Sequence, residues 1–458
     1  MERLSDVVRR IGASLHGADA AFSRVITDTR QLQPGDLFVA LKGDRFDGHD
    51  YVARAMSLGA VGALVSRIVE GGGSQILVAD TLDGLQRYAQ SWRKDFDIPV
   101  IGITGSTGKT TTKQMVAAVV AARGPVLATV GNLNNHIGVP LTLLTLRAEH
   151  RTAVIEMGAS GPGEIALLAR LAQPQIGIVT QAGDAHLEGF GSRVGVAHAK
   201  GELFAAIAGN ASGGVAIINA DDAYAPLWRQ LAGDASVLSF GLAESADVRA
   251  EDLVGVPEHA PEATAFTLVA PVGGARIELA LPGLHNVQNA LSAAAVGIAL
   301  NLGIEQIAKG LANVEPVAGR LNWKTTREGA RVLDDSYNAN PTSLRAALDL
   351  LASLPGQRWL VLGEMRELGP DAASIHEDAG RAARSLGIDR LYTLGEMAGH
   401  AADGYGDTAD SYEQLDDLVA ALKDQIAEGV TVLVKGSRGA RMERVVAALT
   451  GTATEAAH

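Results

Sequence analysis

The sequence contains no cysteine and no long apolar run. Without cysteine, disulfides, thiolate nucleophiles, cysteine zinc sites and iron–sulfur clusters are all excluded, and we expect the protein to act in a reducing cytoplasm. The first ten residues carry charges among their apolar residues, so we expect no secretory signal. The longest nearly apolar stretch, residues 290–300, is about half as long as a membrane-spanning helix must be. Stable insertion into a membrane is therefore not expected.

Positive charge is also scarce, with 39 lysines and arginines against 52 acidic residues and a formal net charge of -13. This balance disfavours broad attraction to nucleic acid or to an anionic membrane surface, and we expect no nucleic-acid partner. Any anionic ligand must therefore meet a local basic pocket. Hydrophobic residues make up 47% and charged residues 20%, as in soluble globular domains, which indicates a chain that folds without a partner.

The 458 residues correspond to about three domains of ordinary size, and their pattern predicts an α/β fold. Residues 1–97 mix short extended runs with turn signals, which indicates a small α/β domain. Residues 98–315 alternate apolar strands with helical segments and predict a central domain with a mainly parallel sheet. A third strand–helix series predicts a Rossmann-like C-terminal domain at residues 316–458. The strands of these two domains are expected at residues 100–103, 153–155, 176–179, 215–218, 331–333, 359–362, 391–394 and 430–434.

A glycine-rich loop connects the strand at residues 100–103 to a helical run that begins at Lys109. In this loop, which reads TGSTGKTT over residues 104–111, backbone N–H groups and the helix N-terminus can converge on phosphate oxygens. Lys109 can supply positive charge to the outer phosphates, and the Thr110 hydroxyl can ligate Mg²⁺. Ile103 stands where the common pattern has its first glycine, so the loop is a variant. The combination of strand, loop and helix favours a nucleoside triphosphate ligand over an ordinary glycine-rich turn.

Several polar side chains near later strands are candidate metal ligands. Glu156 ends an apolar strand beside the loop and could hold Mg²⁺, although a glutamate in this position is more often solvated or capping. His186 is a weaker candidate for a second metal, and Asp184 and Glu188 in the same segment are weaker still. Lys200 lies in a helical segment and by itself indicates a surface lysine.

An ordered series of motifs resembles the Mur ligase family, and the similarity spans nearly the whole chain. The motifs are TGSTGKTT at residues 104–111, GNLNNHIGVP at 131–140, AHLEGFG at 185–191, LPGLHNVQNA at 281–290, GRL at 319–321, DDSYNANP at 334–341 and KGSR at 435–438. The resemblance implies three domains. The N-terminal domain would hold the UDP end of a substrate, the central domain would bind ATP, and the C-terminal domain would close over the nucleotide.

The resemblance also implies roles around ATP and two Mg²⁺ ions. Lys109 would bind the ATP phosphates and Arg320 would contact the γ-phosphate. One Mg²⁺ would be held by Thr110 and Glu156, and the second by His186. The other expected nucleotide-binding residues are Gly105, Ser106, Thr107, Gly108, Thr111, His285, Asn289, Asp335, Tyr337, Asn338 and Asn340.

Lys200 matches the family lysine that adds CO₂ to become a carbamate. This reaction turns a cation into a carboxylate-like group that can support Mg²⁺. The sequence departs from the family pattern at Thr29, where serine is more usual, at Glu364, where aspartate is usual, and at His198, where lysine is frequent. The expected substrate-binding residues are Thr27, Asp28, Thr29, Arg30, Asn134, Asn135, Lys435 and Arg438.

Together the motifs predict an ATP-dependent amide ligase that joins D-alanyl-D-alanine to UDP-N-acetylmuramoyl-tripeptide through an acyl phosphate. Its product would be the UDP-muramoyl-pentapeptide of peptidoglycan synthesis. Positive groups are expected to stabilise charge on the γ-phosphate during transfer. The general base, and the choice between diaminopimelate and lysine as the third stem residue, stay open. We expect a monomer.

Other functions fit the sequence less well. A related ligase that adds the third stem residue, or a folylpolyglutamate synthase, would share the phosphate loop and the carbamate, but the motifs at residues 131–140 and 334–341 disfavour both. A nucleotide-dependent switch is less consistent with a chain that lacks the Asn-Lys-x-Asp guanine-selecting pattern. A structural protein of the cell wall would require the secretion signal that the sequence lacks.

Overall fold

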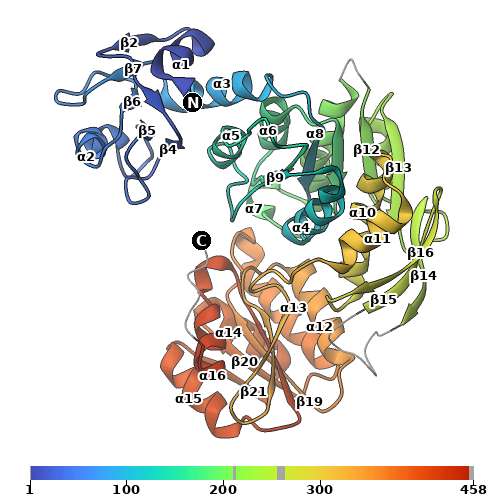
Figure 1. Cartoon of the computed structure of the whole chain (residues 1–458). Coiled ribbons are helices and arrows are strands. Elements are labelled where there is room, and N and C mark those ends of the chain that lie inside the picture. The colour runs from blue at the N-terminus through green and yellow to red at the C-terminus, as the bar shows by residue number, and fades with distance from the viewer. Residues whose placement is uncertain (1, 210–212, 255–263, 453–458) are drawn as a thin grey trace. The chain divides into compact units, whose positions relative to one another are not determined.

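The computed structural model describes residues 2–209, 213–254 and 264–452. These residues form two compact units. The first unit contains the chain up to residue 102 together with residues 124–158 and 164–175, and the second contains residues 103–123, 159–163 and the chain from 176 onward. Both units alternate strands and helices (Figure 1). The α/β fold predicted from the sequence is thereby confirmed.

The N-terminal part of the first unit is a small sheet with the strand order β2-β7-β6-β5-β4. Only β2 runs antiparallel to its neighbour. Phe38 of β5, together with Ala63 and Val65 of β6, packs against Val52 and Ala55 of α2. The elements are β1 (Glu2–Arg3), α1 (Leu4–Ile11), β2 (Ser14–His16), β3 (Ala21–Phe22), β4 (Val25–Ile26), β5 (Leu37–Val39), η1 (Gly48–Tyr51), α2 (Val52–Ser57), β6 (Gly62–Val65), β7 (Gln75–Leu77) and α3 (Thr81–Arg93).

The remainder of the first unit lies against α3. Strand β8 (Val100–Thr104) begins here, with β10 (Thr152–Glu156) beside it and β9 (Val126–Ala128) parallel to β10. All five residues of β10 are buried, as expected for an interior strand of a parallel sheet. Helices α5 (Gly138–Leu143) and α6 (Glu164–Ala172) both contact α3.

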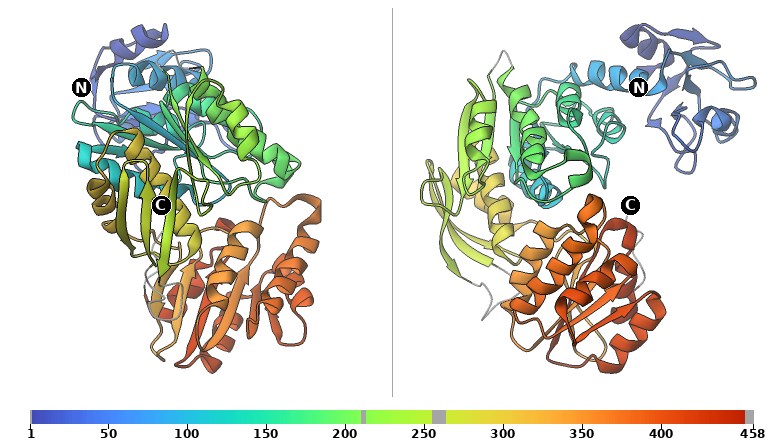
Figure 2. Two further views of the ribbon diagram at one scale, coloured as in Figure 1. Left: turned by 90° about the vertical axis from the view of Figure 1, so that its right-hand side faces the viewer. Right: turned by 180° about the vertical axis from the view of Figure 1, so that it is seen from behind.

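The second unit begins with a sheet of the order β16-β15-β14-β13-β12-β11. Strands β11 to β14 are parallel, whereas β15 and β16 continue the sheet in antiparallel fashion (Figure 2, yellow-green). The sequence did not predict β13 to β16. The strands are β11 (Ile176–Val179), β12 (Val215–Asn219), β13 (Ser236–Gly241), β14 (Val248–Val254), β15 (Thr264–Ala270) and β16 (Gly273–Leu279).

Three helices of the second unit, α4, α10 and α11, pack tightly on one another. A Cβ on Gly310 would lie 2.6 Å from Cα of Val119, and a Cβ on Gly297 would lie 2.7 Å from the Ile307 side chain. Both helix contacts therefore depend on the absence of a side chain. The helical elements of this part are α4 (Lys109–Val120), η2 (Ala121–Arg123), α7 (Leu187–Phe190), α8 (Arg193–Ala208), α9 (Ala225–Leu231), α10 (Leu284–Ala299) and α11 (Ile304–Ala312).

The C-terminal part of the second unit is a sheet of the order β17-β18-β22-β19-β20-β21, parallel except for β17. The strands are β17 (Asn322–Thr325), β18 (Arg331–Asp335), β19 (Gln357–Gly363), β20 (Arg390–Leu394), β21 (Ala409–Tyr412) and β22 (Val430–Lys435). The helical elements are α12 (Pro341–Ala352), η3 (Gly369–Asp371), α13 (Ala372–Ser385), α14 (Glu396–Tyr405), α15 (Leu415–Gln425), η4 (Arg438–Ala440) and α16 (Glu443–Thr450).

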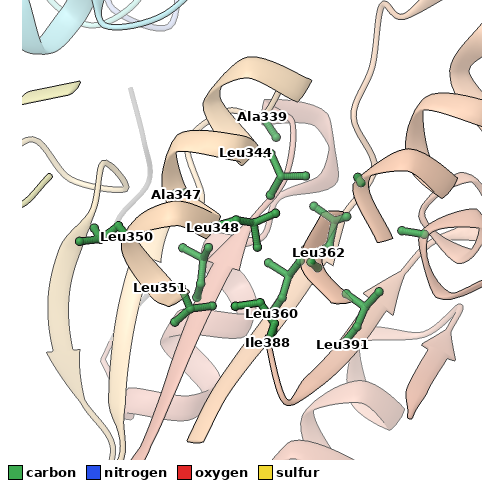
Figure 3. Packing of buried hydrophobic residues seen from close by; sticks show 14 of the residues in the cluster. Ala339, Leu344, Ala347, Leu348, Leu350, Leu351, Leu360, Leu362, Ile388 and Leu391 are labelled. Atoms are coloured by element: carbon green, nitrogen blue, oxygen red, sulfur yellow. The ribbon is translucent and has the colours of Figure 1, made fainter. Parts of the chain in front are cut away.

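Alternate residues of the central strands face opposite sides of this C-terminal sheet. On β19, Leu360 and Leu362 face α12 and α13 (Figure 3), whereas Trp359 and Val361 belong to the cluster under α15 and α16. Helices thus cover both faces, as a mostly parallel sheet requires.

Every strand expected from an apolar run in the central and C-terminal regions is present within a residue or two. No helix within residues 2–209, 213–254 and 264–452 is long and apolar enough to cross a membrane.

Candidate functional site

The glycine-rich loop between β8 and α4 depends on glycine at two positions. Gly105 has a φ of 146°, and a Cβ there would lie 1.8 Å from Thr180 Oγ1. Gly108, the N-cap of α4, has a φ of 78°, and a Cβ there would lie 2.6 Å from Asn289 Oδ1. Both backbone conformations disfavour other residues, and both positions lack space for a side chain.

The N-terminus of α4 forms a concentration of positive charge. The intrahelical ladder begins where Thr112 N–H donates to Gly108 O at 2.8 Å, so the N–H groups of the preceding turn point out of the helix end. Lys109 Nζ donates to Gly105 O at 2.7 Å, which holds its ammonium group over the loop. The helix dipole adds partial positive charge at the same end. This arrangement is suited to an anion.

Arg320 extends this positive region from the segment that precedes β17. Its Nη2 donates to Thr110 Oγ1 at 3.2 Å. The guanidinium lies 4.4 Å from the centroid of the Tyr337 ring, and Arg438 lies 5.2 Å from the same centroid. Within the described residues, Arg320 Nε is buried without a hydrogen-bond partner. The structure thus brings Arg320 and Thr110, two residues predicted from distant motifs, into contact.

Ser106 and Thr107 are hydrogen-bonded to the segment that follows β11. Ser106 N donates to Gln181 O at 3.0 Å, and Ser106 Oγ bonds to Gly183 N at 2.9 Å. Thr107 O accepts from Thr180 Oγ1 at 2.6 Å. These bonds fix the shape of the loop, and the nucleotide contacts predicted for Ser106 and Thr107 stay predictions.

Lys200 is almost completely buried on α8, with 1% exposure. Its Nζ donates to Ala159 O at 3.1 Å and lies 5.0 Å from the centroid of the Phe190 ring. Burial of a lysine ammonium group is costly unless opposite charge or strong acceptors compensate it. The local sequence indicated a surface lysine, and the burial of Lys200 shows that this reading was wrong.

His186 lies immediately before α7 with a φ of 54°. Its Nδ1 lies against the Glu367 carboxylate. Burial lowers the pKa of His186, and the positive charges of Lys109 and Lys200 lower it further, while Glu367 opposes them. The imidazole is thereby held neutral near neutral pH, which is the form that can bind a metal.

Lys435 joins another group of predicted residues at the end of β22. It is 1% exposed, forms an ion pair with Asp335, and donates to Asn338 O at 3.0 Å. Burial raises the pKa of Asp335, although Lys435 opposes the shift. Burial and Lys435 together lower the pKa of His285 to about 4, so this imidazole is neutral at physiological pH.

Two predicted asparagines have structural bonds in the second unit. Asn289 Oδ1 accepts from Thr112 Oγ1 at 3.1 Å, which joins α10 to α4. Asn340 Oδ1 accepts from Ser343 N at 2.8 Å and caps α12. Their predicted contacts to a nucleotide stay predictions.

The predicted residues of the first unit lie in two regions, one that includes the end of β10 and one after β4. Glu156, 2% exposed at the end of β10, accepts from Asn134 Nδ2 at 2.8 Å. Asn135 Oδ1 accepts from the backbone N–H of Gly138 at 2.9 Å, at the start of α5. After β4, Arg30 Nη2 donates to Asp28 at 2.6 Å, and Arg30 lowers the pKa of that carboxyl group. Thr29 lies in the turn that Gln31 N closes on Asp28 O at 3.1 Å, and Thr27 precedes this turn.

Comparisons with known proteins identify the family of this chain. Three family models match: "Mur ligase family, catalytic domain" over residues 1–76, "Mur ligase middle domain" over 103–297 and "Mur ligase, glutamate ligase domain" over 319–438. The UDP-N-acetylmuramoyl-tripeptide–D-alanyl-D-alanine ligase of Escherichia coli K12 is 43% identical over 97% of this chain and 98% of its own length. The chain belongs to the Mur ligase family.

Other members of the Mur ligase family agree with this assignment. The ligase of the same name from Bacillus subtilis 168 is 37% identical over 97% of both chains. A crystal structure of MurF from Acinetobacter baumannii has a TM-score of 0.89 and is 35% identical, covering 97% of this chain and 98% of its own. The MurF ligase of Thermotoga maritima in complex with ADP has a TM-score of 0.82 and is 28% identical, covering 93% of this chain and 96% of its own.

Sequence reasoning about this Mur ligase missed two sets of residues. The first is the bonding of residues 180–183 to the phosphate loop; the position of these residues after a parallel strand places them at the same sheet edge but does not reveal the bonds. The second is Glu367, which contacts His186 from the segment before η3 and has a φ of 61°. No local pattern marks Glu367, because its partner is remote in the sequence.

The Gly105→Ala variant of this Mur ligase is expected to bind nucleotide at least about tenfold more weakly, because the new methyl group must displace the Thr180 hydroxyl. Backbone strain at the positive φ should also lower the free energy of unfolding by about 1–3 kcal/mol. Calorimetric titration with ADP and thermal unfolding measure the two effects. Gly209→Ala is the matched control, since Gly209 has a φ of -75° and ordinary van der Waals distances around it. Equal ADP affinities of the two variants would contradict the expectation.

Proposed function

We propose that this chain is an ATP-dependent ligase that joins D-alanyl-D-alanine to UDP-N-acetylmuramoyl-tripeptide and forms UDP-muramoyl-pentapeptide. The observation that carries the proposal is the positively charged N-terminus of α4, with Lys109 over the loop and Arg320 on Thr110, in a chain that is 43% identical to a ligase of this name. The ADP complex of the related Thermotoga maritima protein supports a nucleotide at this loop.

The reaction consists of two substitutions. A carboxylate oxygen of the tripeptide bonds to the γ-phosphorus of ATP, and ADP leaves. The amine nitrogen of D-alanyl-D-alanine then bonds to the acyl carbon, inorganic phosphate leaves, and the nitrogen loses a proton. Lys109 and Arg320 are positive groups held in place before the reaction, so they stabilise the charge on the transferring phosphoryl group without reorganisation.

Three residues of the second unit have properties that fit Mg²⁺ binding. Thr110 presents a hydroxyl at the first turn of α4, and the lowered pKa of His186 keeps its imidazole neutral. Lys200 is buried, and its positive charge contributes to the lowered pKa of His186. A carbamate at Lys200 would replace that positive charge with a negative group able to support a cation. Bound Mg²⁺ would neutralise negative charge on the phosphates. The metal role of Glu156, in the first unit, stays a prediction from the resemblance.

We also propose that each of three domains binds a different part of the substrates. Residues 1–97, with Thr27, Asp28, Thr29 and Arg30, would bind the uridine diphosphate, and Asn134 and Asn135 would contact the muramyl part. Residues 98–315 would bind ATP. Residues 316–458 would complete the nucleotide site with Asp335, Tyr337, Asn338 and Asn340, and would provide Lys435 and Arg438 for phosphate or substrate. The cysteine-free composition supports a reducing cytoplasm as the compartment.

The proposal is tested by the mass of the product. Purified protein with ATP, Mg²⁺, D-alanyl-D-alanine and the UDP-tripeptide should yield the UDP-pentapeptide together with equal amounts of ADP and phosphate. Tripeptides ending in diaminopimelate or lysine are compared in separate reactions. Omission of the dipeptide should abolish sustained phosphate release.

Two outcomes would favour the competing functions. Phosphate release that does not depend on D-alanyl-D-alanine would indicate a nucleotide-dependent switch. Ligation of a single amino acid to a shorter UDP-muramoyl peptide, or of glutamate to a folate, without use of D-alanyl-D-alanine, would indicate another ligase of the family.

A further inference from the structure

The segment of residues 180–183, which we term the brace segment, follows β11 and runs along the phosphate loop. Thr180 N donates to Thr104 O at 2.9 Å, and Ser106 N donates to Gln181 O at 3.0 Å. The Ser106 hydroxyl and the backbone of Gly183 are also hydrogen-bonded to each other. Backbone and side-chain bonds therefore connect the two segments over residues 104–107 of the loop.

Hydrogen bonds from three other parts of the chain hold the brace segment and the residue that follows it. Asn219 Nδ2, from the end of β12, donates to Thr180 O at 2.8 Å. Asp222 Oδ2 accepts from Ala182 N at 2.8 Å. The next residue along the chain, Asp184, donates its N–H to the Thr342 hydroxyl in the first turn of α12 at 2.9 Å. A segment held in this way can impose a conformation on the loop beside it.

Both acceptor groups of Thr107 are occupied by the brace segment. Its carbonyl oxygen accepts from Thr180 Oγ1 at 2.6 Å, and its hydroxyl oxygen accepts from Gln181 Nε2. A threonine hydroxyl has one proton and two lone pairs. Since the Gln181 amide occupies one lone pair, the hydroxyl proton must point away from Gln181. The hydroxyl keeps its proton, which is turned away from Gln181 and is available for donation to a ligand at the loop.

We infer that Gln181 is a positioning residue, which orients the Thr107 hydroxyl to donate to a phosphate oxygen of the nucleotide. The inference rests on the proposed binding of ATP at this loop. Phosphate oxygens accept hydrogen bonds. A loop residue can therefore bind them when its N–H or O–H groups point toward them and its own acceptor atoms bond to other groups. Thr180 and Gln181 fulfil that condition for Thr107 at its carbonyl and at its hydroxyl oxygen.

Gln181→Met and Gln181→Glu test this role. Methionine keeps the length of the side chain and removes the donor, whereas glutamate accepts the Thr107 proton and adds negative charge beside the phosphates. Loss of one oriented hydrogen bond to a charged group should weaken binding of adenylyl imidodiphosphate about tenfold in the methionine variant and more in the glutamate variant. The KM for ATP should rise in parallel, while the KM for D-alanyl-D-alanine stays unchanged. Gln230→Met, an exposed glutamine on α9, is the control.

A double-mutant cycle with Thr107→Val shows whether Gln181 acts by orienting the Thr107 hydroxyl or only by packing beside the loop. If Gln181 acts through the Thr107 hydroxyl, the double variant should bind adenylyl imidodiphosphate no more weakly than Thr107→Val alone. The inference would be overturned if the effects of Gln181→Met and Thr107→Val on nucleotide affinity multiplied in the double variant. It would also be overturned if Gln181→Met bound the nucleotide as tightly as the Gln230→Met control. A lower melting temperature without any change in nucleotide affinity would do the same, because it would assign Gln181 a structural role only.

The wild-type protein distinguishes failure of this inference from failure of the proposed function. If the wild-type protein binds adenylyl imidodiphosphate and Gln181→Met binds it equally well, the role of Gln181 is contradicted and the proposed ligase function is not. A wild-type protein that does not bind this nucleotide overturns both.

Discussion

Lys109→Met is expected to lower kcat/KM for ligation by a factor on the order of 1,000, the largest effect of any single substitution in this chain. Lys109 holds its ammonium group over the loop at 2.7 Å from Gly105 O, at the positive end of α4. Methionine removes the charge and preserves most of the side-chain volume, so the fold should be retained. Steady-state ligation rates and thermal unfolding measure the two consequences.

Lys309→Met provides the control for this prediction. Lys309 is an exposed lysine on α11 of the same unit, and its substitution should leave the ligation rate unchanged. If Lys109→Met kept more than half of the wild-type rate, phosphate binding at this loop would be contradicted.

If Lys200 carries the proposed carbamate, Lys200→Met is expected to lower kcat on the order of 100-fold, because the group that would support the metal is lost. Its side chain is 1% exposed, and methionine fills a similar volume, so the main loss is chemical. Carbamate formation requires CO₂, so the wild-type rate should fall in CO₂-depleted buffer and recover when bicarbonate is added. The Lys200→Met rate should not respond to bicarbonate. Coupled measurement of ADP release over a range of Mg²⁺ concentrations follows both effects.

A structural role for Lys200 makes different predictions. Lys200→Met would then lower the melting temperature, and the wild-type rate would be insensitive to CO₂. These two results together would contradict the proposed carbamate on Lys200.

The sequence predicted those parts of the molecule whose structure depends on residues close together in the sequence. Strands such as β8 and β22 are largely apolar runs, and the loop around Lys109 contains its glycines and its lysine within a few positions. The antiparallel strands β15 and β16 were missed, because alternation of buried and half-buried residues over β15 is hard to separate from the surrounding loops.

Contacts between remote segments could not be read from the sequence. The bond between Gln181 and Thr107, and the contact between Glu367 and His186, each join residues from different elements. The burial of Lys200 also depends on how α8 packs, since its own neighbours do not distinguish a buried from an exposed position. Asn340, by contrast, precedes Pro341 and caps α12, a role that the Asn-Pro pair itself indicates.

The fate of oxygen in the tripeptide carboxylate tests the central claim most directly. If the loop at Lys109 holds ATP so that the carboxylate is phosphorylated before the amine attacks, ¹⁸O in that carboxylate must appear in the released phosphate. We predict one labelled oxygen in each phosphate, measured by mass spectrometry during ligation of D-alanyl-D-alanine. Unlabelled phosphate, released at the rate of pentapeptide formation, would contradict activation of the carboxylate by phosphoryl transfer.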